Sequence, residues 1–414
     1  MPRKDKEPGL AVYFRDDPVG RLWLDERNRF VFQYHSGWLQ KEGAIPLSLS
    51  LPLGELPYED DTARPFFANL LPEAEIRKII ARRLRISEKN DFALLREIGG
   101  ECAGAVSVVP EGFHPSEQGG YRHVNEEELH KIMVELPRRP LLAGDKDIRL
   151  SLAGAQNKLP VYIEKDRIFL ATGNAPSSHI LKPPITGFEG TVENEAFCMM
   201  LAGRMGLSVP KAVIRHGLDT LYIIERYDRM RIEEGRVLRL HQEDFCQALG
   251  ILPEYKYESE GGPTLARCFT LLKEKSTSPA ADRRMLILWF VFNWLIGNAD
   301  AHAKNLAILY TIRGPRLAPF YDIMCTQVYP ELSGRLAMRI GGENRPRWIR
   351  RRHLDRLGNE VGIKARLIHR IVDEMSESMA QATDAVAEDF VNAYGDCAIV
   401  SKIVDLIRKL SRTL

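Results

Sequence analysis

Acidic, amide and basic side chains follow one another closely in residues 294–306, which read WLIGNADAHAKNL. Asp300 and Asn305 stand as D-x-x-x-x-N. This is the spacing of kinase catalytic loops, where the Asp accepts the proton of the substrate hydroxyl and the Asn holds magnesium. A simpler explanation is the end of the apolar stretch that precedes them, because Asn and Asp favour turns. One such spacing also arises by chance, so the chemistry requires further residues elsewhere.

Charged residues in two other segments match what a phosphoryl-transfer site needs. Asp322 follows the apolar run LAPFY and suits a second magnesium ligand, since magnesium is bound by few protein oxygens. Lys182 ends the apolar strand HILK, as the ATP-binding lysine of kinases does. An acid must hold that lysine, and the next helix offers Glu193 and Glu195. Each residue also has an ordinary explanation: a strand-end aspartate, a surface lysine, and acids that favour a helix N-terminus.

Two further segments complete the order found in kinases. Residues 150–161, LSLAGAQNKLPV, predict a strand, a tight turn at Gly154 and a returning strand, whose backbone N–H groups and Lys158 could cradle phosphates. The segment is not a Walker A sequence, which requires G-x-x-x-x-G-K. IIERYDR, at 223–229, ends a strand where kinases bind adenine, and Tyr227 could cover the adenine face or simply pack. The order of loop, lysine, acidic helix, hinge, D-x-x-x-x-N and aspartate indicates a kinase.

The elements that must position these residues change in character along the chain. Alternating apolar patterns predict strands early in the chain, LSLSLPL at 47–53 included, followed by helices. Strands resume after a polar connector, and TVENEAFCMMLAGRMG predicts a helix capped by Thr191. KAVIRHGL and TLYIIERYDR predict a hairpin. The ranges are 10–53 for the first strands, 66–87 and 90–99 for helices, 113–145 for the connector, and 240 onward for a mainly helical region.

Composition limits the class of protein. With 414 residues, 44% apolar and 28% charged, the chain is expected to be soluble, globular and divided into two or three domains. A net charge of +2 predicts no large non-specific attraction to nucleic acid or membrane. MPRKDKEPGL has no apolar core, so we expect no secretory signal and a cytoplasmic protein. Six cysteines without a C-x-x-C pair argue against a tetrathiolate zinc site and predict buried thiols.

Seven segments together resemble one known family: SLAGAQNK, HILKP, ENE, ERYDR, HQEDFCQALG, GNADAHAKN and FYDIM. They resemble the HipA family, the serine/threonine kinase toxins of bacterial toxin–antitoxin modules, and the resemblance extends over nearly the whole chain. It implies an α+β, protein-kinase-like two-lobe fold with an all-helical C-terminal lobe. The three expected parts are a strand-rich HipA-type module at 1–112, a mixed α/β N-lobe at 113–240, and a helical C-lobe at 241–414.

The resemblance also implies roles for individual residues. Asp300 is expected to be the catalytic base, and Asn305 and Asp322 the magnesium ligands. Ser151 matches the family's autophosphorylated serine, whose phosphorylation ejects the phosphate loop and switches the kinase off. Glu195 is the expected partner of the ATP lysine. The residues expected at the ATP are Ala153, Gly154, Lys158, Lys182, Glu225, Tyr227 and His302. One mild departure is Asn157 in AGAQNK, where an acid is common, which puts fine details of the loop in doubt.

The partners follow from the same resemblance. It implies ATP and Mg²⁺, an antitoxin of the HipB type with a helix-turn-helix, operator DNA bound by the complex, and a protein substrate. The activity would be that of a non-specific serine/threonine protein kinase (EC 2.7.11.1) linked to persistence. Glutamyl-tRNA synthetase is the family's best-known target, and target choice varies within the family.

A basic segment and two alternatives remain open. RPRWIRRRHLDR, at 345–356, holds six arginines and one histidine, and is either a solvated helix face or a phosphate-contacting patch. In the second case Arg347, Arg350 and Arg351 are the expected DNA contacts. A small-molecule kinase of the aminoglycoside-phosphotransferase type shares the D-x-x-x-x-N and Asp arrangement but would not require Ser151. A corepressor whose main work is on DNA is a third possibility, against which the intact catalytic set argues.

Overall fold

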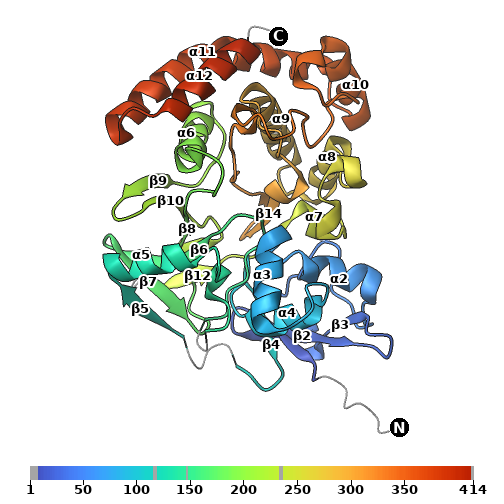
Figure 1. Cartoon of the computed structure of the whole chain (residues 1–414). Coiled ribbons are helices and arrows are strands. Elements are labelled where there is room, and N and C mark those ends of the chain that lie inside the picture. Colours follow the sequence, from blue (N-terminus) through green and yellow to red (C-terminus); the bar gives the residue numbers. More distant parts are fainter. Residues whose placement is uncertain (1–7, 115–118, 146–147, 233–235, 412–414) are drawn as a thin grey trace. The chain divides into compact units, whose positions relative to one another are not determined.

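Strands open the chain and helices close it, as Figure 1 shows. The computed structural model describes residues 8–114, 119–145, 148–232 and 236–411, so most of the N-terminal segment MPRKDKEPGL and part of the expected connector lie outside the described residues. The chain folds as two compact units. The first is drawn from residues 1–181 and 228–253, and the second from residues 182–227 and 254–414. The three expected parts do not coincide with these units, and their boundaries remain a prediction.

The first unit begins with a four-stranded antiparallel sheet in the order β3-β2-β1-β4. Strand residues alternate between buried and part-exposed positions in β3, which is the pattern of a sheet with one covered face. The helices α2 and α4 pack on this sheet and on each other. Its elements are β1 (Leu10–Phe14), β2 (Asp17–Leu24), β3 (Phe30–Tyr34), α1 (Ser36–Leu39), α2 (Asp60–Ala68), α3 (Ala74–Leu84), α4 (Asp91–Ile98) and β4 (Val106–Pro110).

The expected strand at 47–53 is wrong. Ser48 and Leu51 face each other across an isolated bridge inside a turn, in which the Leu51 N–H donates to the Ser48 carbonyl at 3.0 Å. The Leu49 N–H and the Ser48 hydroxyl bind the two carboxylate oxygens of Glu243 at 3.0 and 2.5 Å. The alternation arises because a turn also buries some side chains and exposes others, and the backbone donor that a strand would need is used by a distant acid.

The expected helix at 66–87 is two helices. Asn69 ends α2, and its side-chain amide donates to the carbonyls of Pro65 and Ile251, both at 2.8 Å. Pro72 lies in the break and has no N–H to continue a helix. Leu70 is buried within the break, which is why the apolar spacing continued through it. The break matters because it receives the segment around Ser151, described below.

The rest of the first unit holds strands of a second antiparallel sheet, a separate two-stranded sheet of β11 and β12, the strand β13 and the helices α5 and α7. β7 pairs with β5 and β6, and β6 also pairs with β8. The Asn125 side chain caps α5 by accepting from the Glu128 N–H at 2.9 Å. The elements are β5 (Gly120–Val124), α5 (Glu126–Glu135), β6 (Leu159–Glu164), β7 (Arg167–Thr172), β8 (His179–Lys182), β11 (Arg229–Arg231), β12 (Val237–Arg239), β13 (Gln242–Asp244) and α7 (Phe245–Ala248).

The second unit begins at Lys182, the last residue of β8, and is mainly helical. The helix α6 starts one residue earlier than expected, with Gly190 as N-cap and Thr191, the expected cap, as the first helical residue. α6 packs against α11 and α12, which run side by side at the C-terminus (Figure 1). The elements are α6 (Thr191–Arg204), β9 (Ala212–His216), β10 (Thr220–Glu225), α8 (Leu265–Lys275), α9 (Pro279–Leu295), β14 (Ala307–Thr311), β15 (Gly314–Leu317), α10 (Arg351–Val361), α11 (Ala365–Tyr394) and α12 (Ala398–Ser411).

A β-hairpin interrupts the helical region, which differs from the expectation of helices alone. β14 and β15 pair with Ile308 opposite Leu317, and the hairpin connects the D-x-x-x-x-N segment to Asp322. Arg316 in β15 holds the hairpin to α9 through three hydrogen bonds to Asp282, at 2.8, 3.0 and 3.2 Å. The hairpin therefore fixes how the chain returns from the catalytic-loop candidate to the second acidic residue.

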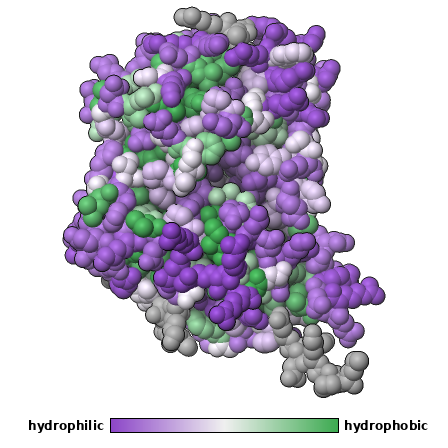
Figure 2. Space-filling model, viewed as in Figure 1, coloured by the Kyte–Doolittle hydropathy of each residue, from purple (hydrophilic) through white to green (hydrophobic). Residues whose placement is uncertain are grey.

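The six cysteines are free thiols, five of them buried and Cys397 part-exposed. Hydrophilic side chains cover most of the face shown in Figure 2, with hydrophobic ones in scattered groups. Within the described ranges, no helix is long and apolar enough to cross a membrane.

Candidate active site

Lys182 is the centre of a buried charge cluster in the second unit. The apolar strand β8 ends at this lysine, whose side chain is only 8% exposed. Its Nζ lies 2.6 Å from Glu195 Oε1 and 2.6 Å from Asp322 Oδ1. The Tyr222 ring lies beside it, with its centre 5.7 Å from Nζ. Of the two acids that the helix offers, the structure brings Glu195 to the lysine, while Glu193 is part-exposed.

The charge state of this cluster follows from its surroundings. Burial alone would lower the pKa of Lys182, but the carboxylates of Asp322 and Glu195 outweigh burial and raise it above its ordinary value. Burial also raises the pKa of the Tyr222 phenol well above its ordinary value, with the nearby carboxylates adding to the effect. At neutral pH the cluster is therefore one ammonium between two carboxylates, which leaves a negative charge for a bound cation to balance.

Asp322 has an unusual backbone. Its φ is +59°, in the left-handed region that residues other than glycine rarely adopt, although Asp and Asn tolerate it best. The Asn305 side-chain amide lies 3.5 Å from the Asp322 carbonyl oxygen, so the two expected magnesium ligands are neighbours. Such strained residues cluster at functional sites because the surrounding structure must hold them.

The segment that carries Asp300 is fixed at both ends. Gly297 takes a φ of +70° directly after α9, and a Cβ there would lie 3.2 Å from the Gln327 side chain. The Asp300 N–H donates to Asn298 Oδ1 at 3.0 Å, and its carbonyl accepts from the His302 N–H at 2.9 Å. The Asp300 carboxylate itself is 54% exposed, so an incoming hydroxyl can reach it. A short 3₁₀ turn then brings Asn305 to Asp322.

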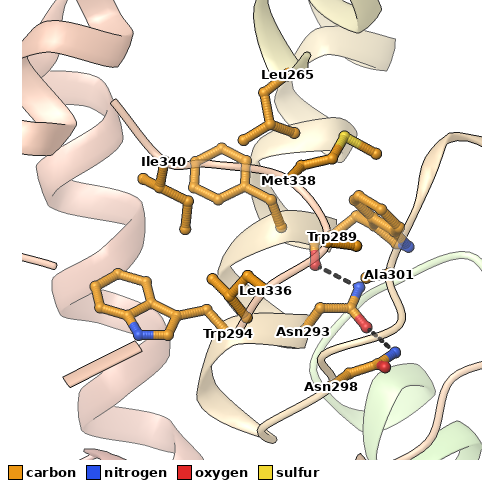
Figure 3. A pocket seen from close by; sticks show the side chains of 11 residues that line it. Leu265, Trp289, Asn293, Trp294, Asn298, Ala301, Leu336, Met338 and Ile340 are labelled. Atoms are coloured by element: carbon orange, nitrogen blue, oxygen red, sulfur yellow. Dashed lines mark hydrogen bonds between the residues drawn. The ribbon is translucent and has the colours of Figure 1, made fainter. Parts of the chain in front are cut away.

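Two buried asparagines connect this segment to α9, as Figure 3 shows. Asn298 Nδ2 donates to Asn293 Oδ1 at 2.7 Å, and Asn293 Nδ2 donates to the Trp289 carbonyl at 2.8 Å. Both amides are 2% exposed and line a small cavity of about 20 Å³ among apolar side chains. The hydrogen bonds thus run from the helix backbone through two side chains to the Asp300 N–H. Asn293, which interrupts the apolar run, therefore has a structural role, because it accepts the hydrogen bond of Asn298.

A tyrosine contacts the expected catalytic base. Tyr257 Oη donates to Asp300 Oδ1 at 2.6 Å. The Tyr257 ring meets the His302 ring edge-on, with centres 5.1 Å apart and planes at 83°. His302 is buried, and its Nε2 lies 4.0 Å from the same Asp300 oxygen. The structure thus groups Asp300, His302 and a tyrosine that carries no local sequence signal.

The expected hinge residues lie at the end of β10. Glu225 is exposed, and its N–H donates to the Lys211 carbonyl at 2.9 Å. The Tyr227 ring lies 5.7 Å from the Tyr321 ring, and Tyr321 directly precedes Asp322. Tyr227 therefore packs, as its simpler explanation required, and does so beside the expected nucleotide site. An adenine role for Glu225 and Tyr227 stays a prediction.

The expected phosphate loop differs from the predicted strand–turn–strand. Residues 150–158 contain no strand, only isolated bridges from Leu150 to Glu101 and from Gly154 to Pro72, and β6 begins at Leu159. Gly154 has a φ of +117°, a conformation that favours glycine. The pattern failed because this segment pairs with parts of the chain far away in sequence. These contacts all lie within the first unit.

The residues of that loop are held by the first unit's own backbone. Ser151 is fully buried, its hydroxyl donates to the Leu70 carbonyl at 2.8 Å, and its N–H donates to the Glu101 carbonyl at 2.9 Å. Lys158 Nζ donates to the Ala153 carbonyl. Phosphate-binding roles for Ala153, Gly154 and Lys158 stay predictions.

The donor set around Asp322 fits magnesium. Asn305 and Asp322 offer amide and carboxylate oxygens, which are the ligands that Mg²⁺ prefers, and the cluster carries the excess negative charge noted above. Among the described residues no three His, Cys, Asp or Glu side chains gather into a metal site. Magnesium in kinase sites takes its remaining ligands from phosphates and water.

Two family models match the chain, the HipA N-terminal domain over residues 10–109 and the HipA-like C-terminal domain over residues 150–383. The chain belongs to the HipA family. A curated relative, "Putative kinase Y4mE" of Sinorhizobium fredii, is 42% identical over 404 residues, which are 96% of each chain. The "Serine/threonine-protein kinase toxin HipA" of Shewanella oneidensis is 32% identical over 92% of this chain and 88% of that protein.

A solved structure agrees. It is described as "Shewanella oneidensis MR-1 Toxin Antitoxin System HipA, HipB and its operator DNA complex". One of its chains matches with a TM-score of 0.85 at 30% identity, over 98% of this chain and 96% of that chain. The expected family and the α+β, kinase-like HipA fold are thereby confirmed.

The arginine-rich segment of this HipA-family chain is partly occupied by its own contacts. Arg350 donates to the carbonyls of Arg347 and Ile349, and Arg351 pairs with Asp373 at 2.8 Å. In the described ranges, no hydrogen bond or ion pair engages the side chains of Arg347 and Arg352, both exposed. A DNA role for Arg347, Arg350 and Arg351 stays a prediction, and the structure leaves Arg347 and Arg352 best able to reach a phosphate.

Proposed function

We propose that this chain is an ATP-dependent serine/threonine protein kinase that acts as the toxin of a HipA/HipB-like toxin–antitoxin system. The observation that carries the proposal is Lys182, held between Glu195 and Asp322, with Asn305 beside the latter. In protein kinases a strand lysine paired with a helix glutamate, next to a metal-binding aspartate, is what binds and orients the triphosphate. HipA family membership favours a protein over an aminoglycoside as the acceptor.

The role proposed for each residue follows from its exposure and its charge. Asp300 is half-exposed and positioned by Asn298, so it serves as the base that takes the proton of an incoming serine or threonine hydroxyl. That hydroxyl oxygen attacks the γ-phosphorus of ATP, and ADP leaves. Lys182 is buried and cationic at neutral pH, so it neutralises the phosphates. Asn305 and Asp322 would hold Mg²⁺, which when bound offsets the charge of the triphosphate.

Autophosphorylation of Ser151 is proposed as the off switch. Its hydroxyl is fully buried against the Leu70 carbonyl, so a kinase can reach it only when residues 150–158 leave this packing. A phosphate adds a charge of about −1.5 to −2 at neutral pH and cannot return beside a carbonyl oxygen in a buried site. Phosphorylation would therefore hold the segment out of its place and keep the kinase inactive.

The partners are proposed by likeness to the Shewanella oneidensis assembly, which contains HipB and operator DNA. We propose an antitoxin of the HipB type with a helix-turn-helix, operator DNA bound by the complex, and a bacterial protein as substrate, with an aminoacyl-tRNA synthetase such as glutamyl-tRNA synthetase to be tried first. A cytoplasmic location follows from such partners.

The test compares Asp300→Asn with Asp389→Asn. The two aspartates are 54% and 52% exposed, and Asp389 sits on the surface in a pair with Arg204. Loss of a general base lowers rates by about 10²–10⁴-fold, so Asp300→Asn should not slow growth or incorporate labelled phosphate. Asp389→Asn should behave as wild type. Mass spectrometry should find phosphate on Ser151 in wild type and not in Asp300→Asn. Equal toxicity and labelling of the two variants would remove Asp300 from the mechanism.

A further inference from the structure

The Tyr257 hydroxyl lies at the position beside Asp300 that the hydroxyl of a protein substrate would occupy. Its phenol oxygen is 2.6 Å from Asp300 Oδ1, within the range of about 2.6–3.2 Å at which a general base holds the hydroxyl it deprotonates. The bond is also of the same chemical kind, because a hydroxyl donates to a carboxylate. No pattern in the sequence connects these two residues, which are 43 positions apart.

The backbone of Tyr257 is anchored, so its side chain can move alone. The N–H groups of Glu260 and Gly262 both donate to the Tyr257 carbonyl at 3.0 Å. The next residue is tied down as well, since the Glu258 carboxylate accepts from the Arg339 N–H at 2.6 Å. A Cβ on Gly262 would lie 2.1 Å from the Tyr255 carbonyl oxygen, so this turn requires glycine. A rotation of the Tyr257 side chain would take its hydroxyl off Asp300 Oδ1 without moving the turn.

Asp300 does not need Tyr257 to be held in place. Its N–H and carbonyl are both bonded within its own loop, to Asn298 and His302. The contact with Tyr257 therefore fills the carboxylate's acceptor site more than it shapes the loop. A tyrosine hydroxyl at Oδ1 excludes a water molecule from the position in which the base would activate it. It thereby blocks one particular side reaction, the hydrolysis of ATP.

We propose that Tyr257 is an acceptor-mimicking gate: its hydroxyl occupies Asp300 Oδ1 until the hydroxyl of a protein substrate displaces it, and until then no water can take that position. This inference rests on the proposed function, in which Asp300 is the base. In the reaction that the gate suppresses, a water oxygen attacks the γ-phosphorus and its proton passes to Asp300. The bond from the γ-phosphorus to the β–γ bridging oxygen breaks, which releases ADP and inorganic phosphate.

The test is Tyr257→Phe, which keeps the ring against His302 and removes only the hydroxyl. Tyr255→Phe is the matched control, because Tyr255 lies in the same turn and is 48% exposed. With Mg²⁺ and ATP and no protein acceptor, release of inorganic phosphate by Tyr257→Phe should rise on the order of tenfold, as for the loss of a hydrogen bond to a charged group. Tyr255→Phe should match wild type. The double variant Tyr257→Phe with Asp300→Asn should lose the increase.

Other results overturn the inference. Unchanged phosphate release in Tyr257→Phe, from a wild type that binds Mg²⁺–ATP and labels Ser151, would reject the gate and leave the proposed function standing. A fall in both phosphate release and Ser151 labelling would make Tyr257 a positioning residue instead. An increase that survives Asp300→Asn would show that water is not activated by this base. Asp300→Asn protein that labels Ser151 as fast as wild type would reject the proposed function, and the gate with it.

Discussion

Glu195→Gln is the most direct perturbation of the lysine cluster. Glu195 is 1% exposed and accepts from Lys182 Nζ at 2.6 Å, whereas Glu193 lies on the same helical turn, part-exposed. Breaking a buried ion pair by removing one partner costs about 3–5 kcal/mol. Because glutamine keeps an acceptor oxygen and Asp322 keeps its charge, we expect the variant to lose about 2 kcal/mol of unfolding free energy. Glu193→Gln should lose less than about 0.5 kcal/mol, as surface changes do.

The measurement is urea unfolding followed by circular dichroism, in which a loss of this size moves the midpoint by roughly 1 M. The pH dependence gives a second check. The pKa of Lys182 is raised in the folded state, so its contribution to stability is complete below the ordinary lysine value of 10.5 and is lost as the pH rises through the raised value. Glu195→Gln removes one of the charges responsible for the raised pKa. The gap between wild type and variant should therefore be constant from neutral pH to about pH 10 and shrink above it.

Two results would refute this reasoning. One is a Glu195→Gln midpoint no lower than that of Glu193→Gln. The other is a gap that stays constant up to pH 11.5, which would mean that the loss comes from packing around Glu195 and not from the charge of Lys182. Nucleotide binding further distinguishes Glu195→Gln from Glu193→Gln. Without Glu195, Lys182 is drawn toward Asp322, so Mg²⁺–ATP affinity should fall in Glu195→Gln and stay unchanged in Glu193→Gln.

Three more predictions concern other parts of the site. Asp322→Asn keeps a side chain that tolerates a left-handed backbone but removes a charge. Its nucleotide affinity, measured by calorimetry, should therefore be the same in Mg²⁺ and in EDTA, whereas wild type should bind more tightly in Mg²⁺. A variant that still binds more tightly in Mg²⁺ would contradict the ligand assignment. Asn298→Asp places an acceptor oxygen against Asn293 Oδ1, where the Asn298 amide donates, so thermal unfolding should show a loss of about 2–3 kcal/mol of unfolding free energy. Asn298→Ser, whose hydroxyl is a donor, is the comparison. Melting of Asn298→Asp like that of wild type would show that the donor does not matter. Replacing Arg347 and Arg352 by Ala should lower the salt slope of operator binding by the antitoxin complex by about two, and an unchanged slope would make the segment a solvated face.

Much of the site could be predicted because its residues sit in local patterns. Lys182 and Glu195 are brought together by a strand and the helix that follows it, an arrangement visible in HILK and TVENEAF. Asp300 and Asn305 are close in sequence, so a single short loop places both. Asp322 comes after a run of apolar residues that the core must hold. In each case the pattern of one or two neighbouring elements is enough.

What could not be predicted depends on contacts between distant segments. Tyr257 reaches Asp300 from a turn with no periodic pattern, and its partner is 43 residues away. Residues 150–158 look like a hairpin, but the backbones of Glu101 and Glu73 bind the Ser151 N–H and the Gly154 carbonyl, which a strand would use. The turn at 47–53 shows the same effect, because the Glu243 carboxylate accepts from the Leu49 N–H. An alternation of apolar and polar residues indicates which side chains are buried. It does not indicate the hydrogen-bond partner of each backbone group.

The strained backbone of Asp322 explains why the hairpin before it belongs to the site. A left-handed non-glycine residue costs of order 1–2 kcal/mol and persists only where its neighbours leave no alternative. Those neighbours are fixed here: the Phe320 N–H donates to the Ser208 carbonyl at 2.8 Å, and the Tyr321 hydroxyl donates to the Lys304 carbonyl at 2.7 Å. The Tyr321 bond runs to the residue directly before Asn305. The two residues before Asp322 are therefore held by the core and by the segment that carries Asn305, and the Asp322 carboxylate meets Lys182 without any nucleotide.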